Sequence, residues 1–249
     1  MGNRLAEILI NWYLVTLYLC LITGIYFFLQ LPKAQQNSKK FWFPFIILVF
    51  VVFYESMGFF TRYHIPLNRY VNELLGNTEF PRYNLWVFNV ANTIIATVLY
   101  LFLIKSWLPP TQKRILTWMI YGFIVTSLVF QFSSIEPLYL DQPMLFAIAA
   151  NLILIACGIY FLQMISDPSF LRANPLRLLS FWKVTILLFT YSLTYIFSVS
   201  IIYVYNINPE LSEFLVLLNR LMGILNQSVL ILIIASPRLT HLFDQEPYS

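Results

Sequence analysis

Two ionisable side chains lie inside apolar segments of this chain and are its strongest candidates for functional residues. Glu55 lies in the stretch FVVFYESMGFF, and Arg220 lies in the stretch LLNRLMGIL. Charged side chains in such surroundings are costly and are functional candidates by default. A carboxylate beside a guanidinium could hold an anionic or zwitterionic solute, and the carboxylate could also carry a coupled proton. The two residues lie roughly 8 and 13 Å from the same side of the membrane by the helical rise, so we predict that they pair, directly or through water.

Uncharged polar residues occur at similar depth in the neighbouring apolar segments. Asn219 and Asn226 share a helical face with Arg220, and Asn89 and Asn92 share a face of another segment. We predict one ligand-binding set: Glu55, Arg220, Asn89, Asn92, Asn219, Asn226, Asn151 and Tyr195. The alternative for each asparagine is a structural role, because amides often hydrogen-bond between membrane helices.

Apolar segments long enough to cross a bilayer must position these side chains. Of the 249 residues, 59% are hydrophobic and 10% are charged. The seven segments are 8–31, 41–60, 85–108, 115–133, 144–166, 181–205 and 211–236. About 20 helical residues span a hydrocarbon core of about 30 Å, and lipid leaves helices as the form that pairs every backbone group within one segment. The sequence predicts an all-α polytopic membrane protein, a single domain over 1–249 built as a bundle of seven transmembrane helices.

Two spans end in similar sequences, which suggests an internal repeat. The first ends in GIYFFLQ from Gly24, and the fifth ends in GIYFLQ from Gly158. A 3+1+3 arrangement, with the fourth span as the linker, would place two three-helix units in parallel orientation, as some transporters do. The alternative is chance recurrence in a chain that is 18% aromatic.

Basic residues are unevenly distributed between the two sides of the predicted bundle. Ten lie after the first, third and fifth spans or in the C-terminal segment: Lys33, Lys39, Lys40, Lys105, Lys113, Arg114, Arg172, Arg177, Lys183 and Arg238. The other side carries Arg4, Arg62, Arg69 and Arg82. The positive-inside rule therefore places the N-terminus outside and the C-terminus in the cytoplasm.

The connection 61–84 is predicted to contain a short helix on the outer surface. Pro66 opens a stretch in which apolar residues share one face and polar residues share the other, and Gly76 is a plausible end. The apolar face comprises Leu67, Tyr70, Val71, Leu74 and Leu75.

The residues needed for the usual membrane-enzyme chemistries are missing from the predicted spans. The two histidines, His64 and His241, lie outside them, so neither a zinc site nor a Ser–His pair is expected within the bundle. Cys20 and Cys157 have no base beside them in the sequence. We therefore expect no catalytic activity, no metal and no cofactor. The scattered Lys and Arg residues argue against a nucleic-acid partner.

The segment Asn84-Leu85-Trp86-Val87-Phe88-Asn89, which follows Glu55, resembles a group of small, uncharacterised seven-span bacterial integral membrane proteins. The likeness covers the whole chain in length and span layout. It implies a seven-span fold in the bacterial inner (plasma) membrane, and it implies no reaction. The Gly-Ile-Tyr-Phe repeat also resembles sugar carriers built from two three-helix units.

Three functions fit these observations. The first is a sensor or receptor-like protein that binds a small solute in an outward-facing polar pocket and signals through a separate cytoplasmic or membrane protein partner. The second is a small-solute transporter in which Glu55 is the proton or substrate site. The third is a structural subunit of a membrane complex, for which the polar residues would serve packing alone. In each case the lipid bilayer is the first partner.

Overall fold

The computed structural model describes residues 11–79 and 82–248, except the side chains of residues 196–206. Every regular element in this part is helical. The long helices are α2 (Trp12–Leu29), α4 (Lys39–Tyr63), α8 (Pro110–Ser133), α9 (Pro143–Ser166), α11 (Leu179–Ile207) and α12 (Pro209–Ala235). One further long segment comprises α6 (Leu85–Phe88), the π-helical η1 (Asn89–Ala96) and α7 (Thr97–Ser106). The short helices are α3 (Lys33–Gln36), α5 (Ile65–Leu74), α10 (Pro168–Leu171), η2 (Pro175–Arg177) and η3 (Ser236–Arg238).

The all-α class is confirmed, and six helical segments are long and apolar enough to cross a membrane, as the predicted membrane protein requires. They are Trp12–Leu29, Lys39–Tyr63, Leu85–Ser106, Pro110–Ser133, Pro143–Ser166 and Pro209–Arg238. The predicted span 181–205 falls in the 29-residue helix α11. Part of that helix lies outside the described side chains, so the seventh crossing stays a prediction. Residues 8–10 of the first predicted span also lie outside the described residues.

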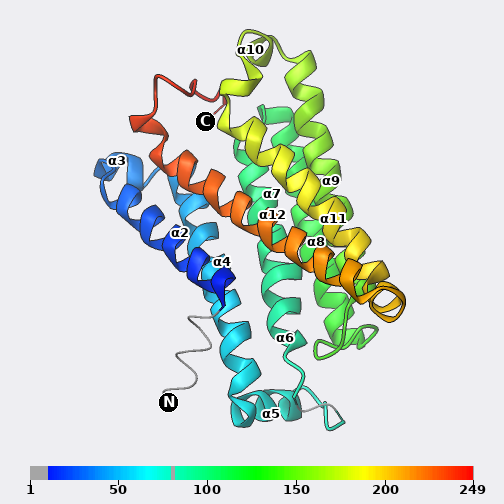
Figure 1. Ribbon diagram of the computed structural model, residues 1–249. Helices are drawn as coiled ribbons and strands as arrows, with labels where there is room; N and C mark the ends of the chain where they lie inside the picture. Colours follow the sequence, from blue (N-terminus) through cyan, green and yellow to red (C-terminus); the bar gives the residue numbers. More distant parts are fainter. Residues whose placement is uncertain (1–10, 80–81, 249) are drawn as a thin grey trace.

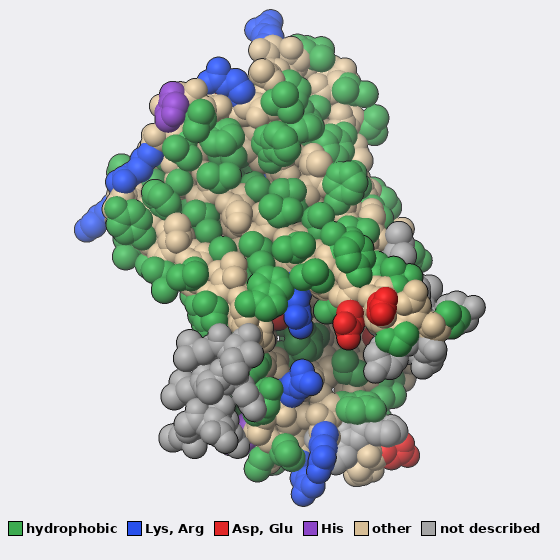
Figure 2. Space-filling view, in the orientation of Figure 1, with side chains coloured by type: hydrophobic (Ala, Val, Ile, Leu, Met, Phe, Trp, Pro, Cys, Tyr) green, Lys and Arg blue, Asp and Glu red, His purple; other side chains and the backbone are tan. Residues whose placement is uncertain are grey.

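The helices pack into one bundle around a shared apolar core. α11 and α12 form a hairpin that crosses the bundle obliquely; α11 packs on α9, and α12 packs on α2 and α4 (Figure 1). α7 contacts α4, α8 and α9 at the centre. Leu48, Ile104 and Leu230 are fully buried in the core. Hydrophobic side chains cover most of the visible surface, as a lipid-facing surface requires (Figure 2).

The proposed internal repeat finds no support in the surroundings of its matching residues. A Cβ atom at Gly24 would overlap Leu48 Cδ2, whereas nothing lies within 4 Å of the same position at Gly158. Tyr26 is 57% exposed, and its counterpart Tyr160 is fully buried. The 3+1+3 arrangement therefore stays unconfirmed.

The predicted short helix is present as α5, but its polar side is the one that packs inward. Asn68 and Asn72 are buried, and both donate hydrogen bonds to the carbonyl of Tyr83. Tyr70 and Leu74 point outward and are exposed. The two asparagines satisfy the Tyr83 carbonyl from the inner side of α5, while the other polar residues of that side, Arg69 and Glu73, stay exposed. α5 lies across one end of the bundle, which we call the α5 end (Figure 1).

The C-terminal tail, residues 239–248, docks against the opposite end of the bundle. Asp244 forms a 3.1 Å ion pair with Arg177, and the Tyr248 hydroxyl donates a 2.7 Å hydrogen bond to Asp167. The carboxylate of Glu246 accepts hydrogen bonds from the backbone N–H and the hydroxyl of Ser180. Because Ser180 lies in the first turn of α11, Glu246 satisfies a backbone donor that the helix itself leaves unpaired.

Two carboxyl groups at the docking contact, Glu246 of the tail and Asp167 at the end of α9, respond to pH in opposite directions. Burial raises the pKa of Glu246 above its ordinary range, whereas the hydrogen bonds from Ser180 and the charge of Lys40 act to lower it. A raised pKa stabilises docking below the free value of about 4.3, and this stabilisation is lost as the pH rises through the raised pKa. The hydrogen bond from Tyr248 lowers the pKa of Asp167. Asp167 therefore stabilises docking above about pH 3.9, and its contribution is lost only in a more acidic range.

We expect the tail to become more mobile as the pH rises from about 4.5 to about 8, because Glu246 must then ionise in a buried site. A nitroxide on Pro247→Cys, in a chain without Cys20 and Cys157, would report this mobility by electron paramagnetic resonance. Glu246→Gln keeps the shape without the charge and should hold the tail docked throughout the range. A wild-type tail that becomes less mobile as the pH rises would contradict the assignment.

Candidate functional site

A wide cavity, here called the vestibule, opens at the α5 end of the bundle. Its volume is about 850 Å³. Three arginines line it, namely Arg62 at the end of α4, Arg82 before α6 and Arg220 on α12, together with the carboxylate of Glu55. None of these arginines forms an ion pair with a carboxylate that the structure describes. Figure 2 shows Lys or Arg side chains at a hollow on this part of the surface. The vestibule is therefore positively charged.

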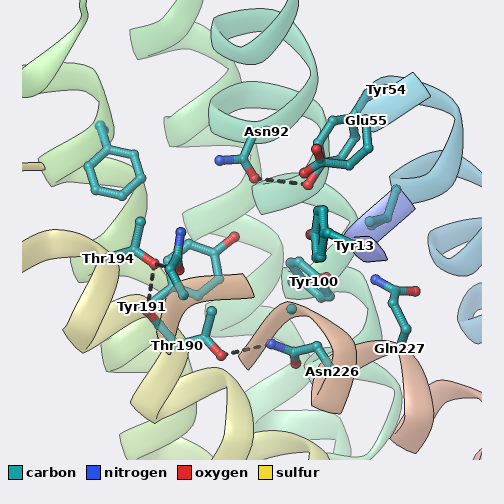
Figure 3. A pocket seen from close by; sticks show the side chains of 14 residues that line it. Tyr13, Tyr54, Glu55, Asn92, Tyr100, Thr190, Tyr191, Thr194, Asn226 and Gln227 are labelled. Atoms are coloured by element: carbon teal, nitrogen blue, oxygen red, sulfur yellow. Dashed lines mark hydrogen bonds between the residues drawn. The ribbon is translucent and has the colours of Figure 1, made fainter. Parts of the chain in front are cut away.

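A smaller cavity, the deep cavity, lies further into the bundle. Its volume is about 110 Å³, and most of the residues that line it carry a polar group (Figure 3). The lining residues are Tyr13, Val51, Tyr54, Glu55, Asn92, Tyr100, Phe146, Thr190, Tyr191, Thr194, Asn219, Gly223, Asn226 and Gln227. They come from α2, α4, η1, α7, α9, α11 and α12. Every helix that contributes to this cavity thus brings polar or aromatic side chains to one point of an otherwise apolar bundle.

Three residues, Tyr13, Glu55 and Asn219, line both cavities and mark the place where they meet. The Tyr13 hydroxyl lies beside the Glu55 carboxylate. The guanidinium carbon of Arg220 lies 5.9 Å from the centre of the Tyr13 ring. Within the described residues, Glu55 and Arg220 do not form an ion pair. The pairing was predicted to be direct or through water; the direct form is absent, the form through water stays a prediction, and Tyr13 contacts both side chains.

Gly223 on α12 permits this close placement of Tyr13. A Cβ atom at position 223 would lie 3.0 Å from the Tyr13 hydroxyl oxygen, tighter than ordinary van der Waals contact. The missing side chain therefore leaves room for the Tyr13 hydroxyl between α2 and α12.

Polar contacts join α11 to α12 along the wall of the deep cavity. Thr194 donates a 3.0 Å hydrogen bond to Asn219, and Asn226 donates a 2.7 Å hydrogen bond to Thr190 (Figure 3). The two pairs fix how the helices face each other, because an amide in apolar surroundings needs its partner. The asparagines thus serve both the packing of the hairpin and the lining of the cavity.

Lys183 on α11 is fully buried inside the bundle next to this wall. Its ammonium group donates to the side-chain oxygen of Asn226 at 2.8 Å and to the Asn226 carbonyl at 3.1 Å. It also lies 5.0 Å from the centre of the Tyr100 ring. No described carboxylate forms an ion pair with it. Lys183 is held by neutral oxygens and an aromatic face, and it contacts two residues of the deep cavity without lining that cavity.

The structure brings five of the eight predicted site residues to the two cavities. Glu55, Asn92, Asn219 and Asn226 line the deep cavity, and Arg220 lines the vestibule. Their ligand-binding role is a prediction that this placement does not test. Among the described residues, no group of three His, Cys, Asp or Glu side chains is arranged to hold a metal ion.

The other three predicted residues line neither cavity. Asn89 donates to the carbonyls of Leu138 and Leu140 and holds the connection between α8 and α9. Asn151 is exposed and bonds to the Ala147 carbonyl of its own helix, while Tyr195 is 37% exposed.

The π-helical geometry of η1 explains the different placement of Asn89 and Asn92. A π-helix turns less per residue than an α-helix, because its hydrogen bonds join residues five apart. Side chains three positions apart therefore point further away from each other than the α-helical spacing predicts. Asn92 reaches the cavity, and Asn89 points to the neighbouring connection.

The sequence reading assigned Lys183 to a cytoplasmic connection, which is wrong. It lies four residues after the first residue of α11, and removing it from the ten basic residues of that side leaves nine against four. Lys183 lies seven residues before Thr190, which lines the deep cavity, so both residues share one face of α11. This spacing could have indicated that Lys183 faces the bundle. Tyr13 and Tyr54 were also missed. Tyrosine is common at membrane interfaces as well, so its presence near a span end does not by itself indicate a cavity.

We expect Lys183 and Asn226 to be energetically coupled. The two single variants should lower the free energy of unfolding by different amounts. Lys183→Met leaves the Asn226 oxygens without a donor and should lower the free energy of unfolding by about 1–3 kcal/mol. Asn226→Leu removes the side-chain oxygen that accepts from Lys183 and also the hydrogen bond to Thr190, while the backbone carbonyl of residue 226 remains. Because two hydrogen bonds are lost, it should cost more, about 2–4 kcal/mol. The double variant should lose less than the sum of the two. Unfolding in mixed detergent micelles measures all three.

The exposed Lys33 provides the control for this experiment, since Lys33→Met removes the same group from the surface. We expect a change within about 0.5 kcal/mol for this variant. Additive losses in the double variant, or equal losses in the two single variants, would contradict the proposed contact.

Comparisons of the chain with known proteins found no match. No model of a protein family matches the chain, and neither does any curated protein or solved structure. The resemblance of residues 84–89 to small seven-span bacterial membrane proteins therefore stays a prediction. The function has to be argued from the two cavities and the residues that line them.

Proposed function

We propose that the protein binds a small polar solute in the deep cavity and acts as a sensor or receptor-like protein of the bacterial inner membrane. The observation that carries this proposal is that Tyr13, Glu55 and Asn219 line both cavities. A buried polar site thus lies directly behind the opening at the α5 end of the bundle. With the orientation predicted from the basic residues, that end faces outward. The proposal includes no catalytic step.

The hydrogen bonds of the deep cavity support a binding role beyond packing. The side-chain oxygens of Asn92, Asn219 and Asn226 accept hydrogen bonds from Tyr54, Thr194 and Lys183, respectively. The side-chain oxygen of Gln227 is buried and has no partner among the described residues. A buried acceptor without a partner costs about 1–3 kcal/mol, and a bound solute that donates a hydrogen bond would remove that cost.

The packing beyond the deep cavity favours a sensor, because it leaves access from one side. Toward the tail end the helices meet in apolar residues that are fully buried, among them Ile104, Leu108 and Leu230. A receptor needs only such one-sided access together with a surface for its partner. The connection that carries Arg172 and Arg177, at the tail end, is the surface we propose for a cytoplasmic or membrane protein partner.

A small-solute transporter is the second candidate, and the buried Lys183 is the observation that favours it. Lys183 contacts the cavity residues Asn226 and Tyr100, while Glu55 lines the same cavity. Proton-coupled transporters use ionisable groups inside the membrane to carry protons, and two such groups lie beside this solute site. Such a role requires the apolar packing at the tail end to open in another conformation.

A thermal-stability screen of the detergent-purified protein against a metabolite library tests the binding function. A ligand at a hundred times its dissociation constant stabilises by about 2.7 kcal/mol, or roughly 5–10 °C. We expect at least one such compound for the wild type and the loss of its effect in Glu55→Gln. Glu213→Gln, an exposed carboxylate on the same side of the bundle, is the matched control and should respond like the wild type.

The outcomes separate the candidate functions. A compound that stabilises the wild type and the control, but not Glu55→Gln, supports the binding site. Flux of that compound into liposomes would then favour the transporter. No stabilising compound, together with a lower melting temperature for Glu55→Gln, would contradict the binding function and leave a structural subunit as the role.

A further inference from the structure

The charges around the two cavities differ in sign, and this difference indicates what kind of solute fits. The vestibule has Arg62, Arg82 and Arg220 against the single carboxylate of Glu55. Unpaired guanidinium groups in a concave site attract and bind anionic groups. The vestibule is therefore suited to a carboxylate or another small anionic group.

The deep cavity has the opposite preference. Among the described residues, Glu55 is the one charged side chain that lines it. The side-chain oxygen of Gln227, which is 1% exposed, is a buried acceptor without a described partner. Four tyrosines, Tyr13, Tyr54, Tyr100 and Tyr191, complete much of the wall. Carboxylate, amide oxygen and aromatic faces all favour a cationic group, and the two oxygens favour one that donates hydrogen bonds. A primary ammonium group meets these requirements.

Lys183 restricts where this ammonium group can lie. Its own ammonium group lies against Asn226 and Tyr100, at one part of the cavity wall. Since Lys183 already donates to both Asn226 oxygens, the acceptors left for a bound cation are the Glu55 carboxylate and the side-chain oxygen of Gln227. Glu55 is also where the deep cavity meets the vestibule. The cation is thereby placed within a short distance of the arginines.

The sizes of the cavities are compatible with one short molecule across both. A cavity of about 150 Å³ holds benzene, so the deep cavity of about 110 Å³ has room for an ammonium group and a few carbon atoms. The vestibule is large enough to leave the anionic group partly hydrated. We propose that the two cavities together bind a small zwitterion of the amino-acid type, with its ammonium group beside Glu55 and Gln227 and its carboxylate among the vestibule arginines. This inference rests on the proposed binding function.

Four compounds of nearly the same size and shape test the two charges separately. γ-Aminobutyrate carries both charges, valerate only the negative one, γ-aminobutyramide only the positive one, and valeramide neither. Glycine, β-alanine and δ-aminovalerate vary the distance between the charges. Binding of each compound to the purified protein is measured by calorimetry and by thermal shift. We expect the zwitterion of best length to bind at least about tenfold more tightly than each of its matched compounds.

Two variants assign the charges to residues. Glu55→Gln should remove the advantage of the zwitterion over the matched carboxylate, because the ammonium group loses its carboxylate partner. Arg220→Met should remove the advantage of the zwitterion over the matched amide, because the carboxylate loses a guanidinium partner. Arg69→Met, an exposed arginine of α5 that lines neither cavity, is the control and should bind like the wild type.

Other outcomes would contradict the zwitterion proposal and leave the proposed binding function intact. Equal binding of valerate and γ-aminobutyrate would contradict the ammonium site and indicate a simple anion. Equal binding of γ-aminobutyramide would contradict the role of the arginines. No binding of the amino-acid series, when the metabolite screen does yield a compound of another class, would refute the inference and leave the binding function standing. Failure of both experiments would refute both.

Discussion

Inside a bilayer every polar group must find its partner within the protein, and the rest of this structure depends on that constraint. It explains why Lys183 is held by Asn226 and why Asn226 in turn bonds to Thr190. Each contact joins α11 to α12 and so fixes the hairpin that closes one side of the bundle. Polar residues in this protein thus act first as connections between helices, and the cavity lies where those connections converge.

The same constraint gives Gln227 its significance. Its asparagine neighbours have donors for their side-chain oxygens, and Gln227 has none among the described residues. In water the missing partner would cost little, because solvent would supply it. In a small polar cavity, the missing donor has to come from water or from a bound solute. The unsatisfied oxygen and the carboxylate of Glu55 together give the cavity its preference for a hydrogen-bond donor.

The length and apolar composition of the segments predicted the helical spans because both are properties of the local sequence. Glu55 and Asn226 were also found from sequence, since a charge or an amide in an apolar stretch is conspicuous. Lys183 was not, because a basic residue near a span end is ordinarily cytoplasmic and only the packing of α12 shows that it is buried. The misplacement of Asn89 has a different origin. The change from α- to π-helical turns is a property of the backbone, and side-chain periodicity does not reveal it.

This π-helical segment has a consequence for sequence comparison. In evolutionary terms a π-turn corresponds to one residue inserted into an α-helix, with the added residue accommodated as a local bulge. A related chain with a plain α-helix in this span would therefore need a gap within residues 89–96 to be aligned correctly. Without that gap, every position from Thr97 onward in the span would be compared with the wrong neighbour. Tyr100, which lines the deep cavity and contacts Lys183, would then seem replaced in relatives that retain it.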